Sequence, residues 1–142
     1  MMIKQRFTLD NWNWDVRVYY AVHGYYVDEI VSRLMDIGIS RKKLKKAERL
    51  LTSGELNTGL TFVKNGRALA VIRRAENAAE YADSIQHEVM HLALFIGREE
   101  GLNPFGEEVC YMGGEIAKKM WPATKLLTSE CGCYTNYIGR EL

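Results

Sequence analysis

The sequence predicts a single α+β domain in which a small twisted β-sheet packs on a central helix, with further helices around it. Short runs of β-branched and aromatic residues occupy residues 2–9, 15–22, 57–64 and 67–73 and predict strands. Other stretches carry apolar residues three and four positions apart, which is typical of amphipathic helices. The length of 142 residues fits one domain, which we expect to span residues 1–142.

The composition is that of a globular protein. Apolar residues make up 47 % of the chain and charged residues 26 %. No run approaches 18 apolar residues, and the N-terminus lacks a signal-peptide pattern, so we expect a cytoplasmic protein with no membrane partner. A formal net charge of +1 gives no indication of a nucleic-acid partner. Three cysteines cannot all pair, so reduced thiols are expected at Cys110, Cys131 and Cys133.

Two strands and two helices are predicted in the first half of the chain. The strands at 2–9 and 15–22 precede a helix from Val27 to Ile37. Ser40 can N-cap a second helix, which runs to about Leu51 and stops at Gly54. This second helix is rich in Lys and Arg between residues 41 and 49. A solvated helix face is the favoured interpretation, with a nucleic-acid patch as the alternative.

A hairpin and a long helix follow. Asn65-Gly66, the preferred pair for a type I′ turn, joins the strands at 57–64 and 67–73. Asn77 and Glu80 then resemble a capping box at the start of a long helix. From about residue 89 this helix is apolar nearly all round, so we expect it to lie between a sheet and a second helix. Its apolar stripe consists of Ala78, Tyr81, Ile85, Val89, Leu92 and Ile96.

The long helix contains the pattern HExxH at His87-Glu88-Val89-Met90-His91. Two histidines four residues apart lie on one face of a helix, one turn above the other. Both imidazoles can therefore reach one tetrahedral Zn²⁺ ion. Glu88, next to the first histidine, can take a proton from a water molecule on that metal. The sequence thus predicts Zn²⁺ bound by His87 and His91, with Glu88 as general base.

A catalytic zinc usually has a third protein ligand. The candidates are Glu107, Glu108, Cys110, Glu99, Glu100 and His23. Asn103-Pro104 predicts the start of another helix, which Pro122 would end. Its predicted core stripe is Phe105, Val109, Met112, Ile116 and Met120. An antiparallel helix pair would bring the beginning of this helix back towards the HExxH helix.

Helical angles favour Glu107 over Glu108 as the third metal ligand. At 100° per residue, Glu107 shares a face with Cys110, Tyr111 and Gly114, away from the core stripe. Tyr111 is a candidate catalytic donor to a developing oxyanion, although such a tyrosine more often simply packs. Asp83, one turn before His87, is a candidate to orient an imidazole. We expect Cys110 to be a core thiol rather than a ligand.

With these residues in place, the sequence resembles the zincin-like metallopeptidases whose third ligand is a glutamate on a following helix. HEVMH followed by Glu107-Glu108-x-x-Tyr111-x-x-Gly114 is similar to small zincin-like proteins of phages and other mobile elements, including peptidases that cleave repressors. The resemblance covers roughly residues 56–121. It implies zinc on His87, His91 and a later glutamate, with Glu88 as base. Because Gly106 precedes an acidic pair, that ligand is either Glu107 or Glu108.

The function expected from these features is zinc-dependent hydrolysis of a peptide or protein substrate. If the strand at 67–73 is an edge strand, an extended substrate could pair with it. One alternative is a phage or mobile-element structural or assembly protein that keeps zinc for stability. Another is a small regulatory binding module in which HExxH is incidental.

Overall fold

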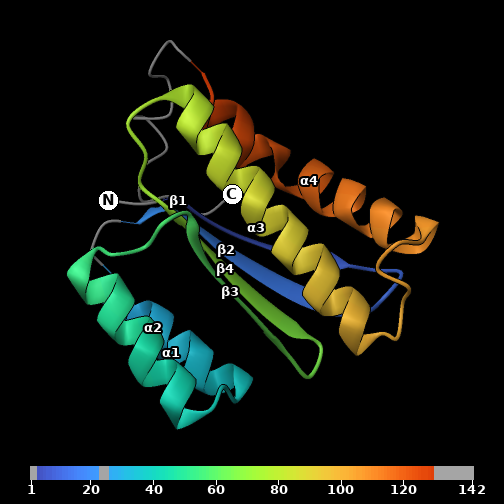
Figure 1. Ribbon diagram of the computed structural model, residues 1–142, viewed down its shortest axis with the longest axis horizontal. Coiled ribbons are helices and arrows are strands. Elements are labelled where there is room, and N and C mark those ends of the chain that lie inside the picture. Colours follow the sequence, from blue (N-terminus) through green and yellow to red (C-terminus); the bar gives the residue numbers. More distant parts are fainter. Residues whose placement is uncertain (1–2, 23–25, 130–142) are drawn as a thin grey trace.

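A computed structural model describes residues 3–22 and 26–129 of the chain (Figure 1). The eight elements are β1 (Ile3–Leu9), β2 (Trp14–Val22), α1 (Val27–Ile37), α2 (Arg41–Ser53), β3 (Gly59–Lys64), β4 (Arg67–Arg73), α3 (Ala78–Glu99) and α4 (Glu107–Leu127). The predicted α+β class is confirmed. His23, Cys131 and Cys133 lie outside the described residues.

The four strands form one mixed sheet in the order β1-β2-β4-β3. β2 and β4 are parallel neighbours in its centre, while β1 and β3 pair antiparallel at the two edges. The sequence left open that the strand at 67–73 is an edge strand. It is not, because β2 and β3 pair with its two sides. The edge strand on this half of the sheet is β3.

Helices cover both faces of the sheet, and two hydrophobic clusters fill the two interfaces (Figure 1). One face packs against α3 and α4 through residues such as Val16, Ala70 and Leu92. The opposite face packs against α1 and α2 through residues such as Tyr19, Leu69 and Leu34. In the described part of the chain, no helix combines the length and hydrophobicity that a membrane span requires.

The predicted helix boundaries hold at α2 and α3 because their capping chemistry is local. Ser40 accepts a hydrogen bond from the Lys43 amide at the start of α2. Asn77 accepts one from the Glu80 amide at 2.9 Å at the start of α3. In the hairpin turn, Asn65 and Gly66 both have positive φ, as a type I′ turn requires.

Two predicted boundaries of the last helix are wrong. α4 begins at Glu107, because the side chain of Asn103 caps a local turn by accepting a hydrogen bond from the Phe105 amide at 3.0 Å. Phe105 therefore lies outside the helix and is 94 % exposed instead of buried. At the other end, α4 continues through Pro122 to Leu127, since Ala123 and Leu127 extend its buried stripe beyond the proline.

Candidate metal centre

His87, Glu88 and His91 come together on one face of α3. Their candidate ligand atoms all lie within 4.8 Å of one another. The two histidine Nε2 atoms are 3.0 Å apart, and the rings meet edge to face with centroids 4.6 Å apart. His87 is exposed and His91 half-buried, so the pair is open to solvent on one side.

The separation of the two imidazole nitrogens fits a shared metal ion. Two nitrogens at about 2.0–2.1 Å from a tetrahedral zinc lie about 3.3 Å from each other. The 3.0 Å between the Nε2 atoms is close to this value, and it is also the length of a hydrogen bond between the two rings. His87 and His91 are therefore two suitable ligands, and imidazole nitrogens suit Zn²⁺.

The glutamate of the motif is buried and held by the edge strand. Glu88 is only 1 % exposed. Thr61 on β3 donates a hydrogen bond to Glu88 Oε2 at 3.2 Å, and Thr58 donates one to Oε1 at 3.5 Å. The alternation of β3 explains this contact, since Gly59, Thr61 and Val63 share the strand face that points towards α3. A buried carboxylate with partners on both oxygens has a fixed orientation beside the histidines.

Gly59 lets β3 lie this close to Glu88. A Cβ atom at this position would collide with the Val71 carbonyl oxygen and would come within 3.1 Å of Glu88 Oε1. No side chain fits between the strand and the carboxylate. The glycine is therefore required here by space and not by its backbone angles.

The histidines open into a cavity of about 390 Å³ between the end of α2, β3 and α3. Its wall on the α3 side consists of His87, Glu88, His91 and Phe95. The opposite wall runs from Leu50 through Leu56 to Thr61. The face of α3 that carries His87 and His91 therefore lies beside β3, the edge strand of the sheet.

Burial perturbs both titratable groups in this pocket. It raises the pKa of the Glu88 carboxyl, and the His87 ring and the hydroxyls of Thr61 and Thr58 oppose that rise. Burial lowers the pKa of His91, and charge on His87 lowers it further. A neutral His91 has a free nitrogen lone pair, which is the form that binds a metal.

The fourth helix does not cover the metal face, contrary to the expectation from the sequence. A Cβ atom at Gly97 on α3 would come within 3.3 Å of Val109 on α4, and one at Gly113 on α4 would come within 3.6 Å of Ala93 on α3. At about 100° per residue, Ala93 lies about 160° around α3 from His91. These small residues allow close approach on the side of α3 away from the histidines, so α4 packs there.

As a result, Glu107 and Tyr111 are not brought to the histidines. Among the residues that the structure describes, Glu107 and Glu108 are exposed in the first turn of α4 and do not belong to the His-Glu-His group. Tyr111 is 71 % exposed and does not line the cavity beside the histidines. The assignments of Glu107 as third ligand and of Tyr111 as oxyanion donor stay predictions.

The remaining candidates also lie elsewhere. Glu100 accepts a hydrogen bond from the Trp14 indole at 2.6 Å, which ties the end of α3 to β2. Glu99 is exposed at the end of α3, and Asp83 is exposed and lines a different cavity. Cys110 is exposed, so the expectation of a core thiol is wrong. It follows Val109, which takes the buried position instead.

Sequence reasoning missed Thr58 and Thr61 as partners of Glu88, and it placed Phe95 on the histidine side of the helix without assigning it a contact with His91. The ring centroids of Phe95 and His91 lie 4.9 Å apart, one helical turn from each other, and the Arg98 guanidinium lies over the Phe95 ring at 5.4 Å. The spacing of Phe95 four residues after His91 could have indicated this contact. The threonines could not have been found in the same way, because their contact depends on how β3 crosses α3.

No protein-family model, curated protein or solved structure matches this chain. The assignment of a function therefore depends on the chemistry of the residues themselves.

Proposed function

We propose that this protein is a zinc-dependent peptidase whose centre is His87, Glu88 and His91. The observation that carries the proposal is the 3.0 Å separation of the two Nε2 atoms, with a positioned carboxylate within 4.8 Å, beside the free edge of a sheet. Two imidazole nitrogens beside a fixed carboxylate are the ligand pair and the general base that a catalytic zinc site uses.

The chain's own residues have distinct tasks in this proposal. His87 and His91 hold the metal, and a bound zinc ion would polarise the scissile carbonyl and lower the pKa of a coordinated water molecule. Glu88 accepts the proton of the attacking water at a carboxylate oxygen. It then gives the proton to the nitrogen of the leaving amine as the C–N bond breaks, so a peptide and one water become a carboxylic acid and an amine.

The neighbouring edge strand supports an extended peptide as the substrate. Among residues 3–22 and 26–129, β3 pairs with β4 on one side only, so its other side offers backbone groups for strand addition. Thr58, Gly59 and Thr61 of this segment also line the cavity beside the histidines. A peptide paired with β3 would therefore pass along the proposed metal centre.

The test combines metal analysis with hydrolysis. Purified protein should contain one zinc per chain, and a mixture of unstructured peptides should be cleaved. Glu88→Gln should keep the zinc and lower hydrolysis at least about 100-fold, the usual loss for a general base. The matched control is Glu48→Gln on the exposed face of α2, which should change neither. Zinc-free wild-type protein, or unchanged hydrolysis in Glu88→Gln, would contradict the proposal.

One observation favours a second candidate, a zinc-stabilised protein without catalysis. Glu88 is 1 % exposed and both of its oxygens have threonine partners, which restricts its access to a substrate. This candidate predicts one zinc per chain and raised stability, with no peptide cleaved. The same two measurements therefore separate the two functions.

A further inference from the structure

A second cavity, unrelated to the histidines, is lined by four arginines. It lies on the sheet face opposite α3, between the end of α1 and strands β1, β2 and β4, and has a volume of about 240 Å³. The charged side chains around it are Arg6, Arg17, Arg33 and Arg67, with Asp15 and Asp36. Four guanidinium groups against two carboxylates leave this depression with a net positive charge.

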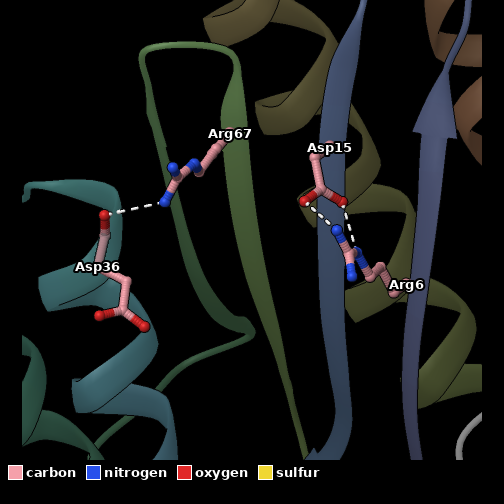
Figure 2. A network of polar contacts seen from close by, with 4 residues as sticks. All are labelled: Arg6, Asp15, Asp36 and Arg67. Carbon is pink, nitrogen blue, oxygen red and sulfur yellow. Dashed lines mark hydrogen bonds and ion pairs between the residues drawn. The ribbon is translucent and has the colours of Figure 1, made fainter.

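The hydrogen bonds show which of these charges are already balanced. Arg6 and Asp15 form a bidentate pair, with Nε and Nη2 each 3.0 Å from a carboxylate oxygen (Figure 2). Arg67 donates instead to the backbone carbonyl of Asp36 at 3.0 Å, and the Asp36 carboxylate points away from it (Figure 2). A carbonyl oxygen fixes the position of Arg67 without cancelling its charge.

Arg17 and Arg33 supply the remaining positive charge. Both are half-buried, Arg17 on β2 and Arg33 on α1. They lie near the buried Tyr19, where both act to lower the pKa of its hydroxyl against the effect of burial. Of the two carboxylates that line the cavity in the described part of the chain, Asp15 pairs with Arg6 and Asp36 is exposed, while Glu29 acts on Tyr19 from outside the lining. Clustered guanidinium groups of this kind recognise phosphate and carboxylate oxygens by paired N–H donors.

The surroundings extend the positive charge beyond the cavity. Residues 1–74 contain fourteen Lys and Arg against seven Asp and Glu, although the whole chain has a net charge of only +1. Ile37 lines the cavity, and the cationic helix α2 starts at Arg41, just after the turn. Lys64 donates to the Gly38 carbonyl in that turn at 2.7 Å. A polyanion held at the cavity would therefore meet further cations beside it.

The geometry points to a phosphate-binding site in this cavity, built by Arg17, Arg33 and Arg67 and separate from the metal centre. A volume of about 240 Å³ corresponds to roughly eight water molecules, which is enough for one phosphate group and its first waters. The bound phosphate is either a free phosphate ion or monoester, or a phosphodiester of a nucleic-acid strand whose neighbouring phosphates lie towards α2.

The test is a titration of the full, chelator-treated chain followed by NMR of the arginine Nε–H signals. Inorganic phosphate should shift the signals of Arg17, Arg33 and Arg67 in a saturable way. The double variant Arg17→Gln/Arg33→Gln should weaken binding at least about tenfold. The control Lys45→Gln/Arg49→Gln, on the exposed face of α2, removes the same charge and should change it less than about twofold. Thermal unfolding of each variant checks that it folds.

Two further arms make the result decisive. Arg33→Lys keeps the charge but loses the paired donors, so it should still weaken phosphate binding. A short single-stranded oligonucleotide that binds more tightly than phosphate, with the same loss in Arg17→Gln/Arg33→Gln, would identify a phosphodiester, whereas binding of phosphate alone would identify a free phosphate or monoester. The absence of saturable shifts, equal losses in the two double variants, or equal binding of acetate would overturn the site.

Discussion

The hydroxyl of Thr61 on the edge strand donates a hydrogen bond of 3.2 Å to the carboxylate of Glu88 on α3. This contact joins the free edge of the sheet to the glutamate of HExxH. It orients the one carboxylate in the proposed centre, and it does so from the strand on which a substrate would dock. In the proposed function, one strand would therefore both support the general base and bind the peptide.

Replacing Thr61 by valine should destabilise the protein. The change leaves a buried carboxylate oxygen without its donor, so we expect the free energy of unfolding to fall by about 1–3 kcal/mol. Thr58→Val should have a smaller effect, because its hydrogen bond is longer at 3.5 Å. Urea unfolding of the metal-free protein measures both. In a Glu88→Met background, Thr61→Val should lose most of its effect, and an undiminished effect there would show that the hydroxyl acts on something else.

Gly59→Ala should be destabilising for a different reason. The new methyl group would collide with the Val71 carbonyl and press on Glu88 Oε1, so we expect a loss of at least about 1–3 kcal/mol. Gly114→Ala is the matched control, since a Cβ atom there meets nothing within 4 Å and the residue lies inside α4. It should stabilise by about 0.5–1 kcal/mol. Thermal unfolding of both variants gives the comparison, and a neutral Gly59→Ala would mean that β3 can move away from α3.

The sequence predicts the elements well where their signals are local. Ser40, Asn77 and Asn65-Gly66 each act on backbone groups within a few residues, and the helices and the hairpin begin or turn where they indicate. The predicted start of α4 is wrong because an asparagine side chain can cap a turn as well as a helix, and Asn103 caps a turn. The predicted end at Pro122 is also wrong, because burial of Ala123 and Leu127 outweighs the loss of the backbone N–H donor at the proline.

The residues of the candidate site were likewise predictable from the sequence only where their arrangement is local. His87, Glu88 and His91 come from one helix, so their juxtaposition follows from spacing alone. Contacts to other elements depend on how helices and strands pack, which a helical wheel cannot determine. The wheel grouped Glu107 with the small face of α4, but the face that meets α3 contains Val109 and Gly113, and it meets α3 on the side away from the histidines.

This packing bears directly on the third ligand. The sequence favours Glu107, whereas the structure has both Glu107 and Glu108 exposed on a helix that packs on the other side of α3. In this arrangement, Glu107→Gln and Glu108→Gln should each change zinc affinity by less than about twofold and stability by only a few tenths of a kcal/mol through the helix dipole. A competitive zinc titration measures both. A tenfold loss, about 1.4 kcal/mol, in Glu107→Gln alone would show that α4 rearranges to supply this ligand.

Zinc should stabilise the protein through the two histidines. A ligand that binds only the folded state at 100 times its dissociation constant adds about 2.7 kcal/mol to the free energy of unfolding. We expect zinc to raise the melting temperature of the wild-type chain, and to have little effect on His87→Ala or His91→Ala. Calorimetry with and without zinc makes the comparison, with Asp83→Ala as the control on the same helix. Full zinc stabilisation of both histidine variants would exclude this pair as the metal site.

In the metal-free protein, His91 should make stability depend on pH. Burial lowers its folded-state pKa below the ordinary value of 6.5, so the unfolded chain binds the proton more readily. The contribution of His91 is therefore fully present above about pH 6.5, and it is lost as the pH falls from there through the folded-state pKa. Glu88 acts in the opposite sense, because its raised pKa gives a contribution that is present at low pH and lost as the pH rises through the folded value.

The two effects can be separated in a Glu88→Gln background. There, the free energy of unfolding in chelator should fall between about pH 7.5 and about pH 5, and adding His91→Gln should flatten that slope. The expected slope follows from the burial of His91 and from the charge on its neighbour His87, since both lower the pKa of His91 in the folded chain. Urea unfolding at several pH values measures the slope. An equal slope with and without His91 would mean that this imidazole is as free to protonate in the folded chain as in the unfolded one.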